Sequence, residues 1–213
     1  MPPFGPTAVR VDTAHIHLIR VLMRYHDDQD YVHDIAAICE QALDCLERAQ
    51  VHYASPAIVL DIDETSLANE WSKLLRREAH GVAGERYSYY DQDEWNRSVE
   101  GACSPAIAPT LAIYRVARAR GWDVIFITGR PHTQRAATES NLRNVGFEQW
   151  TEVVMRGEAE LNIDASVYKS AARRRITEDG HTIVVNVGDQ ASDLSGGYAD
   201  HTFKLPNPFY FVA

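Results

Sequence analysis

The sequence predicts a three-layer α/β domain built around a parallel sheet. Two observations carry this prediction. Short, continuous apolar runs of strand length recur along the chain, and they alternate with stretches of helical periodicity. Strands of a parallel sheet are covered on both faces, so they are expected as unbroken apolar runs rather than as alternating patterns. Strands that alternate with helices are typical of βαβ units with right-handed crossovers.

The first elements expected are two helices that pack outside the sheet. Residues 1–12 are rich in proline and predict no regular element. Apolar residues at helical spacing then predict a helix over about 13–25. The His-Asp-Asp stretch at 26–28 would break this helix and offer acidic capping residues for a second helix near 29–49.

The sheet is expected to begin after this second helix. Apolar runs predict four strands, at 57–60, 124–127, 153–155 and 183–187. Helices are expected between them, near 106–120, 133–145 and 167–179. An aromatic and highly charged stretch at about 66–105 interrupts this alternation directly after the first strand. We expect a single domain over 1–213, with 66–105 as a cap-like insertion over the edge of the sheet where ligands bind.

Composition excludes several classes of partner. A net charge of -9 argues against a nucleic-acid polymer, because binding its phosphates needs clustered lysine and arginine. The three arginines at 173–175 are expected on a solvated helix face. No apolar run approaches the roughly 18 residues of a membrane span, so no membrane partner is expected. The amino terminus shows neither a basic region nor an apolar run, which predicts a cytoplasmic location. The three cysteines lack metal or redox spacing and are expected to be reduced.

Polar and acidic side chains follow three of the predicted strands. Asp61 and Asp63 come after the first strand, Thr-Gly-Arg at 128–130 after the second, and Asp189 and Asp193 after the fourth. Ligands of open parallel sheets bind outside the carboxyl ends of the strands. The sequence therefore predicts one site at this edge.

Four acids brought close together imply a cation. Their like charges would raise one another's pKa values unless a positive ion neutralised them. Oxygen ligands suit a hard divalent cation, and Mg²⁺ in particular pairs with phosphate. Two acids spaced by one residue, Asp61 and Asp63, can then serve as a nucleophile and as a proton-transferring group.

These motifs resemble those of the haloacid dehalogenase-like (HAD) superfamily, whose core is a Rossmann-like sheet. Asp-Ile-Asp-Glu-Thr at 61–65 resembles its first motif, DxDxT, and Thr128 with Gly129 and Arg130 resembles the second. Lys169 fits the third motif, and Gly-Asp-Gln-Ala-Ser-Asp at 188–193 fits the GDxxxD form of the fourth. All four occur in the expected order.

Further segments resemble subfamily IIIB of this superfamily. Its members include plant acid phosphatases and vegetative storage proteins, and bacterial class B acid phosphatases are related. The similar segments are Tyr-Lys-Ser at 168–170, Phe-Lys-Leu-Pro-Asn-Pro at 203–208 and Asp-Glu-Trp at 93–95. Many relatives are exported, whereas no signal peptide is visible here.

The resemblance implies a phosphatase that hydrolyses a small phosphate monoester. Asp61 would attack phosphorus and form an aspartyl-phosphate. Asp63 would protonate the leaving oxygen and then activate the hydrolytic water. The Mg²⁺ ligands would be the Asp61 side chain, the Asp63 backbone carbonyl and Asp189.

The resemblance also implies which residues hold the substrate. Thr128, with Gly129 in the same motif, would donate a hydrogen bond to a phosphoryl oxygen, and Lys169 would place a positive charge there. Arg130 would touch the substrate or pair with an acid at the rim. Asp193 would orient Lys169 or a metal-bound water.

Other functions share parts of this pattern. A phosphotransferase or phosphomutase would keep every core motif and differ only in the acceptor. A non-enzymatic storage or binding protein could use the same fold, although Asp61 is present here. A dehalogenase would need neither Asp63 nor a metal. In the insertion, Trp71, Tyr89 and Trp95 could form a small core of the cap or stack on substrate.

Overall fold

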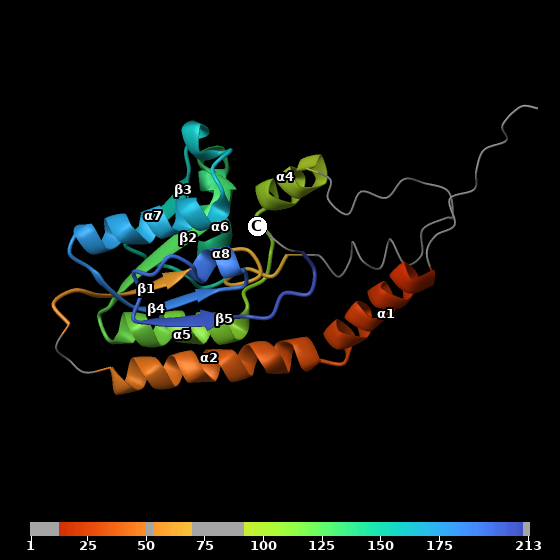
Figure 1. Cartoon of the computed structure of the whole chain (residues 1–213), viewed down its shortest axis with the longest axis horizontal. Coiled ribbons are helices and arrows are strands. Elements are labelled where there is room, and N and C mark those ends of the chain that lie inside the picture. Colours follow the sequence, from red (N-terminus) through yellow and green to blue (C-terminus); the bar gives the residue numbers. More distant parts are fainter. Residues whose placement is uncertain (1–12, 50–52, 70–91, 211–213) are drawn as a thin grey trace, which may run out of the picture.

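The centre of the molecule is a five-stranded, wholly parallel sheet. The structure is a computed structural model that describes residues 13–49, 53–69 and 92–210. The strands are β1 (Pro56–Leu60), β2 (Asp123–Pro131), β3 (Glu152–Arg156), β4 (Thr182–Gly188) and β5 (His201–Lys204). Their order across the sheet is β3-β2-β1-β4-β5 (Figure 1). The four predicted strands are all present, and β1, which precedes Asp61, lies in the middle.

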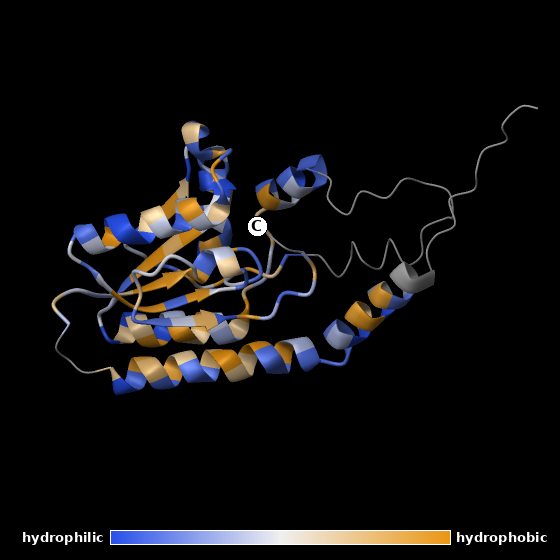
Figure 2. Cartoon of the chain, viewed as in Figure 1, coloured by the Kyte–Doolittle hydropathy of each residue, from blue (hydrophilic) through white to orange (hydrophobic). Residues whose placement is uncertain are grey.

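Helices cover both faces of this sheet. On one face lie α2 (Asp30–Arg48) and α5 (Ala108–Ala119), which contact each other and the strands. On the other face lies α7 (Ala165–Glu178), with the short α8 (Ala191–Leu194) beside it. Figure 2 shows apolar strands between helices whose outer sides are polar. This is the predicted three-layer arrangement.

The central strand shows why these runs are continuously apolar. Ile58 and Leu60 belong to the core cluster on the α2 and α5 side. Ala57 and Val59 belong to the cluster beneath α7. Because successive side chains of a strand point to opposite faces, a strand between two helical layers needs an apolar residue at every position.

The amino-terminal helices occur where expected, but their junction differs from the prediction. Helix α1 spans Thr13–Asp27, extends away from the sheet and contacts α2 (Figure 1). The acidic residues at 26–28 were expected to cap α2, and this was wrong. The cap residue is Gln29, whose backbone is left-handed (φ 67°) and which makes no side-chain cap hydrogen bond. A single left-handed residue therefore separates the two helices, and the chain bends there (Figure 1).

Only the ends of the insertion at 66–105 lie among the described residues. Leu67 forms isolated bridges with Asp63 and with Ala106, so the insertion leaves and returns beside the first strand. Helix α4 (Gln92–Glu100) contacts α6 (Arg135–Asn144). The aromatic residues at 71, 87, 89 and 90 lie outside the described residues, and a cap over the site stays a prediction.

Three short elements had no clear sequence signal. β5 has only one apolar residue, Phe203, among four, because it is an edge strand with exposed side chains. The 3-10 turns η1 (His132–Gln134) and η2 (Glu158–Glu160) follow β2 and β3.

No helix in the part of the chain that the structure describes is long and apolar enough to cross a membrane. Cys39, Cys45 and Cys103 are free, as expected.

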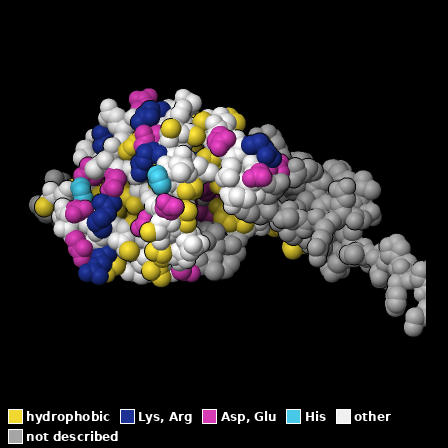
Figure 3. Space-filling view, turned by 90° about the horizontal axis from the view of Figure 1, so that it is seen from above, with side chains coloured by type: hydrophobic (Ala, Val, Ile, Leu, Met, Phe, Trp, Pro, Cys, Tyr) yellow, Lys and Arg dark blue, Asp and Glu magenta, His cyan; other side chains and the backbone are white. Residues whose placement is uncertain are grey.

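The arginine run at 173–175 is only partly the solvated face that was expected. Basic and acidic groups are mixed on the surface seen in Figure 3. Arg174 pairs with Glu178 at 2.8 Å, and both side chains are exposed. Arg173, however, is fully buried, so the prediction was wrong for this residue. Neighbouring positions of a helix point in different directions, and a run of identical residues need not share one environment.

Candidate active site

The chain turns sharply directly after β1. The Asp61 amide still belongs to the sheet, because it donates to the Val187 carbonyl at 3.0 Å. The amides of Ser66 and Leu67 then both donate to the Ile62 carbonyl, at 2.9 and 2.8 Å. The Ser66 hydroxyl donates to the Asp61 carbonyl at 2.6 Å. These bonds fix the main chain on which Asp61 and Asp63 are carried.

Glu64 ties this turn to α2. Its backbone is left-handed (φ 54°) and its side chain is 2% exposed. Its carboxylate accepts hydrogen bonds from the Tyr31 hydroxyl at 2.9 Å and from the Asn69 amide at 2.7 Å. Burial raises the pKa of Glu64 to about 8, although both hydrogen bonds lower it. Glu64 therefore acts as a structural support of the turn, a part that the sequence motif did not predict.

Lys169 links two of the predicted acids. It extends from α7, and its Nζ lies 2.5 Å from Asp61 Oδ1 and 2.5 Å from Asp193 Oδ1. All three side chains are almost completely buried. This contact brings together residues from three segments. The contact places Asp193 beside Lys169, which it was expected to orient, and that role stays a prediction.

Burial and charge act in opposite directions on this cluster. Burial raises the pKa of Asp61 well above its ordinary value, and the Lys169 ammonium opposes this rise. Burial lowers the pKa of Lys169, but the carboxylates of Asp193 and Asp61 outweigh it and hold that pKa above its usual range. Lys169 is therefore held as a buried cation. A single cation does not balance the neighbouring acids.

Asp189 completes an acidic cluster. One oxygen from each of Asp61, Asp189 and Asp193 can be chosen so that all three lie within 4.8 Å of one another, and all three residues are buried. Burial, and then the Asp193 charge, raise the pKa of Asp189. With Lys169 counted, three carboxylates and one ammonium leave an excess negative charge in the interior. An all-oxygen donor set with excess negative charge suits a divalent cation.

Asp63 is held by a different cation. The Arg130 guanidinium contacts both carboxylate oxygens of Asp63, with Nη2–Oδ1 at 2.6 Å and Nε–Oδ2 at 3.1 Å. Arg130 is 3% exposed, and it also lies over the Trp95 ring at 5.8 Å. Of the two expectations for Arg130, the structure shows the ion pair with an acid. Its contact with substrate stays a prediction.

Thr128 and Gly129 lie within β2, which continues to Pro131 instead of ending at 127 as expected. Thr128 is fully buried, and its Oγ1 accepts a hydrogen bond from the Arg130 amide at 3.1 Å. Gly129 is exposed, and a Cβ there would meet only Arg156 Nε, at 3.9 Å. There is therefore free space beside the main chain at Gly129. The roles of both residues towards substrate stay predictions.

A glycine is required at position 188 of the fourth motif for a steric reason. A Cβ at Gly188 would lie 2.3 Å from the Cβ of Asp193, closer than real atoms approach. The short helix α8 folds back over this glycine, and Asp193 Oδ2 accepts from the Gln190 amide at 2.8 Å. Because Gly188 has no side chain, Asp193 can pack directly against it, and in this position Asp193 reaches Lys169.

Arg173 supports the same loop and was missed by the sequence reasoning. Its guanidinium donates to the backbone carbonyls of Asp193, Ser195 and Gly197. Arg173 and Lys169 are four residues apart on α7, so they lie on the same face of the helix. One face of α7 thus provides both the ammonium of the site and the support beneath Asp193.

Comparison with known proteins identifies the family. A family model described as HAD superfamily, subfamily IIIB (Acid phosphatase), matches residues 7–213. The chain belongs to this family. The resemblance that the sequence motifs indicated is thereby confirmed.

Individual relatives of this subfamily IIIB chain include plant proteins. Acid phosphatase 1 of Solanum lycopersicum is 36% identical over 155 residues, which are 72% of this chain and 58% of the tomato protein. The chain thus spans less than two thirds of that relative. A stem 31 kDa glycoprotein of Glycine max is 32% identical over 190 residues, covering 88% of this chain and 72% of the soybean protein.

A solved structure supports the fold of this subfamily IIIB chain. The class C acid phosphatase from Bacillus anthracis matches with a TM-score of 0.68 at 20% identity. The match covers 92% of this chain and 86% of the bacterial chain. The HAD-like α/β fold that the sequence predicted is therefore confirmed.

Proposed function

We propose that this chain is a Mg²⁺-dependent phosphatase that hydrolyses a small phosphate monoester through an aspartyl-phosphate on Asp61. The observation that carries the proposal is the buried contact of Lys169 with Asp61, next to Asp189 and Asp193. Family membership supports the phosphatase chemistry. The proposal extends to this chain the activity that the tomato relative's name states for that protein.

In the proposed first step, a carboxylate oxygen of Asp61 attacks phosphorus and the bond to the ester oxygen breaks. Asp63 gives a proton to that leaving oxygen. Lys169 places its positive charge beside the oxygens of the transferred group, and Thr128 donates a hydrogen bond to one of them. Phosphoryl transfer depends mainly on such positioning and on neutralising the equatorial oxygens.

In the proposed second step, water attacks phosphorus of the aspartyl-phosphate. Asp63, now a carboxylate, takes a proton from this water, and the bond between phosphorus and Asp61 breaks. Inorganic phosphate leaves and the Asp61 carboxylate is regenerated. Asp63 thus acts first as acid and then as base.

The residues that would hold Mg²⁺ are the side chains of Asp61 and Asp189 and the main-chain carbonyl of Asp63. Their oxygens are the ligands that this ion prefers, and the excess charge around Lys169 fits a divalent cation. Bound Mg²⁺ would neutralise the phosphoryl oxygens as they approach the acidic cluster.

The test is release of phosphate from an aryl phosphate, with Mg²⁺ or with a chelator. Wild type should turn over only with the ion. Asp61→Asn should lose at least about 10³-fold in kcat, because the nucleophile is gone. Asp44→Asn is the matched control, since Asp44 is an exposed residue of α2 paired with Arg48.

The outcomes separate the alternatives. Equal turnover by wild type and Asp61→Asn would refute the assignment of the nucleophile. Folded wild-type protein that binds Mg²⁺ but releases no phosphate from a panel of monoesters would instead favour a storage or binding protein. Transfer to an added alcohol or sugar in place of water would favour a phosphotransferase.

A further inference from the structure

Asp189 is held by donors from three separate segments of the chain. The side-chain amides of Gln190 (Nε2) and Asn207 (Nδ2) both donate to its Oδ2, each at 2.6 Å. The Thr65 hydroxyl donates to its Oδ1 at 3.2 Å. The Lys204 ammonium donates to its backbone carbonyl at 3.0 Å. The DxDxT turn, the residue before α8 and the segment after β5 therefore meet on one carboxylate.

The two oxygens of this carboxylate are not equivalent. A carboxylate oxygen has about two lone-pair sites, and two short amide contacts fill those of Oδ2. Oδ1 has one longer contact with a hydroxyl and keeps a second site. Asp189 can therefore offer a cation one oxygen, and that oxygen is Oδ1.

The side-chain amide of Asn207 is itself fixed by hydrogen bonds at both its nitrogen and its oxygen. Its own Oδ1 accepts from the Phe209 amide at 2.8 Å and from the Tyr210 amide at 3.4 Å. These two donors settle which end of the side-chain amide is the oxygen, so Nδ2 must face Asp189. Asn207 is thus locked within a turn of the main chain and presents a donor to the acid.

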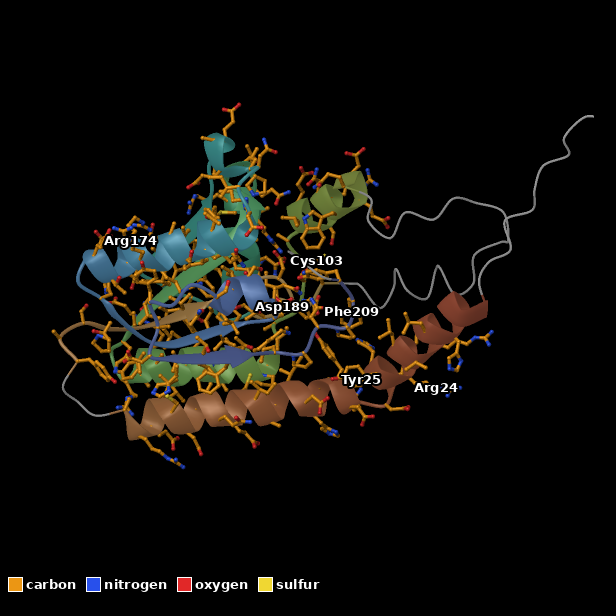
Figure 4. All side chains as sticks on the ribbon, in the orientation of Figure 1. Arg24, Tyr25, Cys103, Arg174, Asp189 and Phe209 are labelled. Atoms are coloured by element: carbon orange, nitrogen blue, oxygen red, sulfur yellow. The ribbon has the colours of Figure 1, made fainter. Side chains whose placement is uncertain are left out.

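The segment that carries Asn207 is anchored to the body of the protein. The Leu205 amide donates to the Gly188 carbonyl at 2.9 Å, and Leu205 is fully buried. Beyond Asn207, the Phe209 ring meets the Tyr31 ring of α2 edge-on at 5.2 Å. Figure 4 shows Asp189 and Phe209 at the same end of the sheet, with Phe209 beside the junction of the first two helices. The donor on Asp189 therefore has rigid support.

We infer that Asn207 and Gln190 are positioning residues that block Oδ2 of Asp189 and so restrict this acid to a single contact with the metal. Mg²⁺ takes one oxygen per carboxylate in a strict octahedron, whereas the larger Ca²⁺ readily accepts both oxygens. The two amides thereby favour Mg²⁺ over Ca²⁺. This inference rests on the proposed function, because it assumes that Asp189 is a metal ligand.

The experiment is calorimetric titration of the full chain with MgCl₂ and separately with CaCl₂, without substrate. Asn207→Ala should weaken Mg²⁺ binding by about 10–100-fold, which is the usual effect of removing a group that orients a ligand. Its affinity for Ca²⁺ should fall by less than about threefold, because the freed Oδ2 becomes a second contact. Asn144→Ala, an exposed asparagine at the end of α6, is the matched control and should match wild type.

Each outcome decides the inference. Unchanged Mg²⁺ affinity in folded Asn207→Ala, or equal losses for both ions, would overturn it while leaving the proposed metal site intact. Wild type that binds neither ion would overturn the metal site and this inference together. Gln190→Ala removes the other donor to Oδ2 and should shift the preference the same way, so it replaces Asn207→Ala if that variant does not fold. A Mg²⁺ preference retained in Gln190→Ala would then refute the inference.

Discussion

Replacing Lys169 by methionine tests whether the acids of the site depend on one buried cation. The substitution keeps a long, unbranched side chain but removes the ammonium. It breaks two contacts of 2.5 Å, and the side chains of Asp61 and Asp193 that lose them are 6% and 3% exposed. Neither carboxylate can be rehydrated without opening the structure.

The expected loss follows from this burial. Removing one partner of a buried ion pair costs about 3–5 kcal/mol, because the other charge is left uncompensated. A domain of this kind has only about 5–15 kcal/mol of stability in total. Without divalent metal, Lys169→Met should therefore lower the free energy of unfolding by about 3–5 kcal/mol. Mg²⁺ should raise the free energy of unfolding of wild type, since a cation bound only by the folded state stabilises it.

The assay is urea unfolding followed by tryptophan fluorescence, with chelator and then with Mg²⁺. Arg48→Met is the control, because Arg48 pairs with Asp44 at an exposed site where such pairs contribute about 0–1 kcal/mol. A loss in Lys169→Met no larger than in Arg48→Met would refute the argument that Lys169 stabilises these two buried side chains. A free energy of unfolding of wild type that Mg²⁺ leaves unchanged would contradict the metal site.

Three further substitutions test the supports of the site by urea unfolding. Gly188→Ala should cost about 1–3 kcal/mol or more and most of the activity, because the new methyl group collides with Asp193. Arg173→Met should cost about 3 kcal/mol, because three carbonyls lose a buried donor. Tyr31→Phe should cost about 1–3 kcal/mol, because the buried Glu64 carboxylate loses a hydrogen bond.

Each substitution has a control and a contradicting result. The controls are Gly101→Ala for Gly188→Ala, Arg174→Met for Arg173→Met, and Tyr25→Phe for Tyr31→Phe. A Cβ at Gly101 would have no contact closer than 3.4 Å, Arg174 forms an exposed ion pair, and Tyr25 forms an exposed hydrogen bond. All three controls should stay within about 1 kcal/mol of wild type. Full activity in Gly188→Ala would contradict the close approach of Asp193. Variants of Arg173 or Tyr31 that match their controls would contradict the assigned supports.

The centre of the fold was predictable because its signals are local. The run at 57–60 is apolar at every position because helices cover both sides of β1, and the acids after it lie at the edge where parallel strands end. β5 was not predictable, because an exposed edge strand needs no apolar run. The capping of α2 was misjudged, because Gln29 adopts a left-handed backbone that sequence does not favour for glutamine.

The chemical groups of the site could be predicted, but their supports could not. Asp61, Lys169 and Asp193 were grouped by motif order, and they meet in the structure. Arg173 looked like part of a surface charge run, and only the position of the loop after β4 shows why it is buried. Asn207 lies far along the chain from Asp61, and no spacing rule links a side-chain amide to a carboxylate across a sheet. Such contacts depend on tertiary packing.

The most direct test of the central claim is detection of the phosphoryl group on Asp61. Enzyme mixed with an aryl phosphate and Mg²⁺ is quenched in acid within one turnover, digested and analysed by mass spectrometry. The account predicts one phosphoryl group on the peptide that contains Asp61. It predicts more of it in Asp63→Asn, because an aryl leaving group needs little help from an acid in the first step, whereas the second step loses its base. It predicts none in Asp61→Asn. Turnover with no phosphoryl group on that peptide, or with the group on another residue, would contradict the account.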